Sequence, residues 1–74
     1  MKKEDYSIDY RNDTLGAVRD IRKRLKMARA GHVINFVCND AQIIRLLREI
    51  TYSEGVIIHQ ETTAEGLYIT IRKT

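Results

Sequence analysis

The hydrophobic residues of this 74-residue chain switch repeatedly between two spacings, and the chain contains no proline that would interrupt either of them. A spacing of two residues predicts strands over residues 6–10, 32–38, 56–61 and 67–73, because successive side chains of a strand point to opposite faces. Spacings of three and four residues in the two intervening segments predict helices. The predicted order of elements is therefore βαβαββ.

Each predicted helix carries one apolar stripe. In the first helix, Asp13 or Thr14 is expected at the N-cap, and Gly31 is expected to end the helix. Its predicted buried stripe consists of Leu15, Val18, Ile21, Leu25 and Ala28. Asn39 and Asp40 are expected to cap the second helix, and Gly55 is expected to close it. The predicted buried stripe of that helix consists of Ile43, Ile44, Leu46, Leu47 and Ile50.

A single apolar stripe lets each helix pack against one layer only, so both helices can cover the same face of a sheet. The expected fold is an α/β two-layer sandwich in which two helices lie on one face of a mixed four-stranded sheet. The last two strands form a hairpin whose turn is expected within residues 62–66. The opposite, open face of the sheet is expected to carry Asn35, His59, Tyr68, Thr70 and Arg72.

The length of the chain and its sparse cysteines and histidines limit what it can hold. A chain this short forms one domain, predicted over residues 6–74, after a flexible N-terminus at residues 1–5. No apolar run approaches the roughly 20 residues of a membrane helix, and residues 1–10 do not resemble a signal peptide, so we expect a cytoplasmic protein with no membrane contact. One cysteine and two histidines allow no internal disulfide and suggest no metal cluster, so neither a metal nor another cofactor is expected.

Positive charge is concentrated in one segment. Six basic residues and one acid lie within residues 14–30, although the formal net charge of the whole chain is only +3. On a helical wheel five of the basic side chains fall within about 120° of one another, beside the apolar stripe. These five residues are the predicted partner-binding surface: Arg19, Arg22, Lys23, Lys26 and Arg29. Such a surface attracts an acidic protein or a nucleic acid, unless it is merely solvated.

The chain resembles the TusA/SirA family of small sulfur-carrier proteins. The signature of that family, Asp-x-x-Gly-x-x-Cys-Pro, runs from the first strand into the first helix. In "DYRNDTLG", Asp9 stands at the aspartate, Asn12 at the glycine, and Leu15 with Gly16 at the Cys-Pro pair. A gap of one residue would instead place Thr14 and Leu15 at that pair. The resemblance covers nearly the whole chain. It implies the same fold, a motif-equivalent segment that also includes Asp13, and a surface for docking partner proteins near the start of the first helix.

The family's reactive cysteine is absent from this position, and leucine, glycine and threonine cannot carry a persulfide. We therefore expect a non-catalytic protein-binding or regulatory module whose partner has an acidic surface. A protein of sulfur metabolism is one candidate partner. Asp13 and Thr14 are interpreted as helix caps rather than as ligands. His32 and His59 have no partner at catalytic spacing and are expected to have surface roles.

Two other functions stay open from the sequence. Cys38 precedes the second helix and is the one residue that could act as a displaced carrier thiol, although the strand alternation places it with the core residues Ile34 and Phe36. The second alternative is an RNA-binding module that uses the basic side chains of the first helix. The strands lack the aromatic pattern that many RNA-binding sheets carry, which disfavours this alternative.

Overall fold

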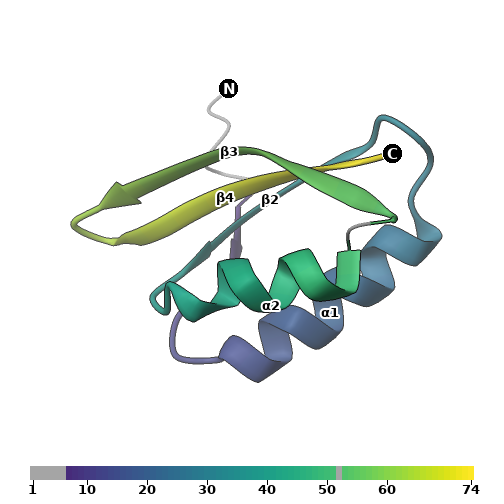
Figure 1. The fold of residues 1–74 in the computed structure, drawn as a ribbon. Coiled ribbons are helices and arrows are strands. Elements are labelled where there is room, and N and C mark those ends of the chain that lie inside the picture. Colours follow the sequence, from purple (N-terminus) through teal and green to yellow (C-terminus); the bar gives the residue numbers. More distant parts are fainter. Residues whose placement is uncertain (1–6, 52) are drawn as a thin grey trace.

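The computed structural model describes residues 7–51 and 53–74 of the chain. Figure 1 shows a curved sheet above two helices. The elements in chain order are β1 (Ile8–Asp9), α1 (Thr14–Met27), β2 (Val33–Cys38), α2 (Gln42–Thr51), β3 (Gly55–Thr63) and β4 (Gly66–Lys73). The predicted flexible terminus at residues 1–5 and the predicted strand position of Tyr6 lie outside the described residues.

The four strands form one mixed sheet in the order β1-β2-β4-β3. β1 pairs with β2 in parallel, whereas β4 is antiparallel to both of its neighbours, β2 and β3. Both helices cover the same face of this sheet (Figure 1). The predicted fold, a two-layer α/β sandwich with βαβαββ order, is confirmed.

The core lies between the sheet and the helices. β2 contributes Ile34, Phe36 and Cys38, as its alternation predicts, and β4 contributes Ile69 and Ile71. The two helices contribute Ala17, Ile21, Leu25, Ile43 and Leu47. The side chain of Ile50, which was expected in the stripe of α2, lies outside the described part of the chain.

The prediction that Leu15 is buried was wrong: its side chain is 76% exposed, and Ala17 is buried in its place. The buried residues of α1 recur every four positions at Ala17, Ile21 and Leu25, so they lie on one narrow face of the helix. Leu15 is rotated by about 120° from Ile21 on the same helix. It therefore lies outside the narrow core-facing side.

The predicted ends of several elements also differ from the observed ones. α1 ends at Met27 rather than near Gly31, because Ala28 adopts an extended conformation and its N–H bonds to the carbonyl of Leu25. Gly31, at φ 90°, lies in the turn before β2, where its N–H donates to the carbonyl of Lys73. Gly55 is the first residue of β3 rather than the end of a helix.

The strands differ from prediction in length. β1 has two residues instead of five, and the N–H of Tyr10 adds one more hydrogen bond to the carbonyl of Val37. β3 continues through Thr63, so only Ala64 and Glu65 separate it from β4. Among the described residues, no helix is long and apolar enough to cross a membrane.

The open face of the sheet carries the residues predicted there. Asn35 on β2 and His59 on β3 both pair with Thr70 of β4, and the Thr70 hydroxyl donates to Asn35 Oδ1 at 2.7 Å. A bulge between Ile57 and His59 shifts the register of β3. Because the helices cover the other face, this row of polar side chains points away from them.

Candidate functional site

The start of α1, where the signature cysteine would stand, is built around Asp13. Asp13 is the N-cap of α1, and its carboxylate accepts the N–H of Gly16 at 3.1 Å. A Cβ on Gly16 would lie 2.2 Å from an oxygen of Asp13, so a larger residue would displace this cap. A proline at position 16 would also remove the N–H that Asp13 accepts. The local structure thus requires a residue unlike the proline of the signature.

Thr14 joins the starts of the two helices. Its hydroxyl donates to Asp40 Oδ2 at 3.1 Å, and Asp40 Oδ1 accepts the N–H of Gln42 at 3.0 Å. Asp40 therefore caps α2, as predicted, while Asn39 does not. The predictions that Asp13 and Asp40 act as caps are confirmed, and both carboxylates are occupied by contacts within the protein.

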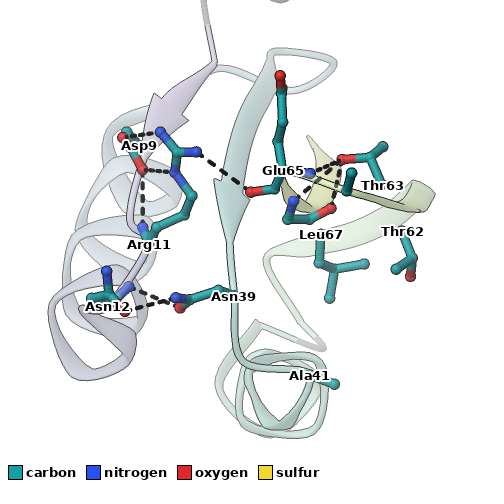
Figure 2. Close-up of a pocket in the computed structure, with 11 residues that line it drawn as sticks. Asp9, Arg11, Asn12, Asn39, Ala41, Thr62, Thr63, Glu65 and Leu67 are labelled. Carbon is teal, nitrogen blue, oxygen red and sulfur yellow. Dashed lines mark hydrogen bonds and ion pairs between the residues drawn. The ribbon is translucent and has the colours of Figure 1, made fainter.

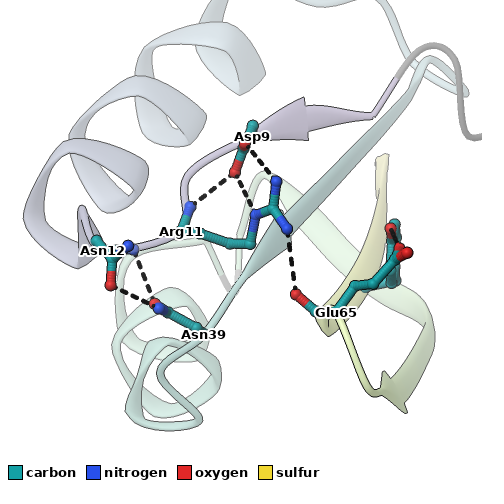
Figure 3. Close-up of polar contacts among 6 residues, drawn as sticks. Asp9, Arg11, Asn12, Asn39 and Glu65 are labelled. Atoms are coloured by element: carbon teal, nitrogen blue, oxygen red, sulfur yellow. Dashed lines mark hydrogen bonds and ion pairs between the residues drawn. The ribbon is translucent and has the colours of Figure 1, made fainter.

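The loop after β1 holds two polar pairs (Figure 3). Arg11 binds Asp9 through two guanidinium nitrogens, each at 2.9 Å, and lies 3.4 Å from the carbonyl of Glu65. The Arg11 guanidinium lowers the pKa of the Asp9 carboxyl to about 2. Asn12 adopts φ 67° and exchanges two hydrogen bonds with Asn39. The Asn12–Asn39 pair joins the loops that follow β1 and β2, and Arg11 joins the loop after β1 to the turn between β3 and β4.

The same pairs line an open hollow of about 650 Å³ between the loops after β1 and β2 and the β3–β4 turn (Figure 2). Three charged side chains line it: Asp9, Arg11 and Glu65. The one cation among them, Arg11, is already bound to Asp9. The described lining therefore offers no unpaired positive charge for an anionic ligand, and we interpret the hollow as a structural junction.

Cys38, the candidate carrier thiol, is fully buried. Its sulfur lies 3.8 Å from the carbonyl oxygen of Leu67 and 4.0 Å from that of Asp40. Burial raises the pKa of the thiol; a backbone contact at Asp40 lowers it by less, and the charge of Asp40 raises it further. A buried thiol with a raised pKa forms little nucleophilic thiolate, so this position is poorly suited to sulfur transfer.

The exposed side of α1 holds four of the five predicted basic residues, which we call the basic ridge: Arg19, Arg22, Lys23 and Lys26. All four are exposed, and none has a hydrogen bond or ion pair to another residue in the described ranges. The fifth, Arg29, is also exposed but follows the end of α1. The structure therefore separates Arg29 from the helical ridge.

The one acid of α1, Asp20, does not neutralise the ridge. Asp20 Oδ2 accepts the Tyr10 hydroxyl and also the Nε of Arg24 at 3.0 Å. The Tyr10 hydroxyl and then Arg24 lower the pKa of Asp20. Asp20 and Arg24 are four residues apart on α1, a spacing that favours an ion pair, whereas the contact with Tyr10 joins two separate elements and has no such local signal. Because Asp20 is held by these partners, the ridge keeps its positive charge.

The two histidines are not brought together with a metal-binding set. His59 lies 3.6 Å from Glu61 in an exposed pair on β3, and His32 lies in the turn before β2. No group of three or more metal-ligating side chains occurs among residues 7–51 and 53–74.

Comparisons of this chain with family models, with curated proteins and with solved structures found no match. The fold and the site together define the chain as a small two-layer α/β domain with an unpaired basic helix surface. The exposure of Leu15, at the N-terminal end of that surface, is the feature that sequence reasoning missed. The spacing of Ala17, Ile21 and Leu25 by four residues fits this outcome, but it does not by itself exclude the wider stripe that includes Leu15.

Proposed function

We propose that this protein is a TusA/SirA-like, cytoplasmic domain without the signature cysteine that acts as a non-catalytic protein-binding or regulatory module. Its partner carries an acidic surface and contacts the basic ridge, and a protein of sulfur metabolism is one candidate for this partner. The observation that carries this proposal is that all four ridge cations are exposed and have no hydrogen bond or ion pair within the described part of the chain. Unpaired charge of one sign on a rigid helix both attracts and orients an oppositely charged partner.

The resemblance to the family is supported by the order of the elements and by Asn12. This residue stands at the glycine of the signature and adopts φ 67°, a backbone conformation that glycine and asparagine accept most readily. The backbone at Asn12 is therefore compatible with the glycine of the signature, whereas Leu15 and Gly16 replace its Cys-Pro pair.

The absence of catalysis is supported by the surroundings of Cys38. Both the burial of the thiol and the charge of Asp40 raise its pKa, and the sulfur has no exposed surface. A carrier thiol must reach the sulfur donor and the acceptor in turn, which a fully buried side chain does not do without local unfolding. Thus no observation favours the sulfur-carrier alternative.

The test is affinity capture from the source cytoplasm with three versions of the protein: wild type, Lys23→Glu/Lys26→Glu, and Arg45→Glu/Arg48→Glu. The last variant makes the same change in net charge on exposed residues of α2. We expect one acidic protein to be captured by wild type and by the α2 variant, and to be lost from the ridge variant. Capture that both charge variants abolish equally would indicate an effect of net charge alone and would contradict the proposal.

Nuclease treatment separates a protein partner from RNA, because both would bind the basic ridge through charge and both would lose affinity with salt. Neutralising several phosphates would make the affinity fall on the order of 10-fold or more between roughly 50 and 200 mM salt. If nuclease treatment removes the captured material, the bound partner is a nucleic acid and the proposed protein-binding function is wrong.

A further inference from the structure

Leu15 lies on the same line of α1 as the basic ridge. Relative to Leu15, the ridge residues Arg19, Arg22 and Lys26 follow at positions i+4, i+7 and i+11. At about 100° per residue these four side chains fall within about 60° of one another around the helix. Leu15 is therefore the N-terminal member of a straight row that continues with three cations and spans about 16 Å along the helix axis.

A single exposed apolar side chain is common on protein surfaces and needs no partner. Leu15 differs from such a residue because of its position. It is 76% exposed, and it stands in the first turn of α1, the turn that Asp13 caps. The residues that follow it along the row are unpaired cations. A partner drawn to those cations would be placed directly over Leu15.

We propose that Leu15 and the basic ridge form one docking surface, in which Leu15 is the apolar anchor. The partner is a protein whose acidic surface has an apolar pocket at one end of a row of carboxylates. The proposal rests on the proposed function and adds the apolar half of the recognition. Charge complementarity to the basic ridge selects and orients the partner, and burial of Leu15 holds it. This arrangement is typical of protein interfaces, in which an anchor side chain fills a pocket surrounded by a charged rim.

The anchor also distinguishes a protein from a nucleic acid at the same surface. Phosphate groups contact the ridge cations without any need for Leu15, and a leucine at that position offers no stacking surface to a base. A partner whose affinity depends on both Leu15 and the ridge must therefore present apolar and acidic groups together.

The experiment uses two fluorescent synthetic peptides that carry the same number of glutamates. In one peptide, leucines stand between the glutamates. In the other peptide, serines occupy the same positions. Binding of each peptide to the full chain is measured by fluorescence anisotropy at fixed ionic strength. We expect wild type to bind the leucine peptide more tightly by on the order of 10-fold, the value expected when one leucine side chain becomes largely buried.

Four variants separate the contributions. Leu15→Ser should remove the preference for the leucine peptide, whereas Leu15→Met should keep it because methionine is also apolar. Met27→Ser is the matched control, since Met27 is 78% exposed on the same helix but lies about 100° from Lys26 around the axis. Lys23→Glu/Lys26→Glu should weaken the binding of both peptides and leave their ratio nearly unchanged.

The possible failures are distinguishable. A leucine-peptide preference that persists in Leu15→Ser, or that Met27→Ser removes as well, overturns the anchor but leaves the basic ridge in place. Equal binding of the two peptides by wild type also overturns the anchor. If neither peptide binds wild type, or the ridge variant binds both as wild type does, the proposed function itself fails. Circular dichroism of each variant establishes that the domain is folded before binding is compared.

Discussion

Asn12 and Asn39 exchange two hydrogen bonds across the ends of the parallel strands β1 and β2. The backbone N–H of Asn12 donates to Asn39 Oδ1 at 2.8 Å, and Asn39 Nδ2 donates to Asn12 Oδ1 at 2.7 Å. Asn12 makes this contact from a left-handed conformation, φ 67°, which turns the chain from β1 toward α1. The pair therefore links the loop that precedes the docking surface to the loop that precedes α2.

The first prediction concerns this pair. Asn12→Ala should lower the free energy of unfolding by about 2 kcal/mol. It removes the hydrogen bond between the two side chains, and alanine accepts the left-handed conformation less readily than asparagine does. Asn12→Gly should cost about 1 kcal/mol less, since glycine accepts that conformation. Urea denaturation of the two variants measures the difference. Equal stabilities would show that φ 67° carries no strain at this position.

A second prediction compares two glycines with positive φ. A Cβ on Gly66, at φ 148°, would lie 2.7 Å from the carbonyl oxygen of Cys38 and 3.0 Å from a methyl group of Val37. A Cβ on Gly31, at φ 90°, would meet nothing within 4 Å. Gly31→Ala should therefore cost about 1 kcal/mol from backbone strain alone, and Gly66→Ala should cost more, at least about 2 kcal/mol, because β2 and β4 must move apart.

Thermal unfolding of the two glycine variants, followed by circular dichroism, measures this order. The Gly31 variant is the control for backbone strain without a steric clash. A Gly66 variant that melts at or above the temperature of the Gly31 variant would contradict the close approach of the β3–β4 turn to the end of β2.

The third prediction concerns the thiol of Cys38. Because the side chain is buried and its pKa is raised by that burial, a small disulfide reagent should modify native protein at neutral pH far more slowly than it modifies protein in denaturing urea. The rate should rise with urea in parallel with the unfolded fraction. If the native protein were modified as fast as the unfolded chain, the hypothesis that Cys38 is a carrier thiol would be favoured again.

The fourth prediction is a loss of stability in alkali. Burial, and then the hydrogen bond to Asp20, raise the pKa of Tyr10 from 10.0 to about 12. A group with a raised pKa in the folded state contributes stability that is fully present below pH 10.0 and lost as the pH rises toward about 12. The free energy of unfolding should therefore fall over this range.

The Tyr10→Phe variant isolates this contribution. Phenylalanine does not titrate, so the difference in stability between wild type and Tyr10→Phe should shrink as the pH passes from 10.0 toward about 12. At neutral pH the variant should be less stable by about 1 kcal/mol, because the hydrogen bond to Asp20 is lost. Urea denaturation across the pH range measures both quantities. A difference that stays constant with pH would mean that Tyr10 keeps its ordinary pKa in the folded protein.

Part of the candidate site could be predicted from local sequence alone. The cap at Asp13, the Asp20–Arg24 pair and the cluster of cations on α1 all involve residues within four positions of one another or on one helix. A helix brings such residues together whatever it packs against, because its 3.6-residue turn is set by its own backbone hydrogen bonds. The same holds for the alternation that placed Cys38 in the core with Phe36.

The sequence by itself determined the order of the elements, the inward face of β2 and the basic character of α1, because each of these follows from a periodic pattern within one segment. Only the tertiary structure decided that Leu15 is exposed, that Tyr10 binds Asp20, and that Asn12 meets Asn39. An apolar stripe on a helix leaves open which of its edges faces the sheet, and contacts between distant residues depend on the strand order β1-β2-β4-β3. The docking surface is therefore a product of how α1 is rotated against the sheet.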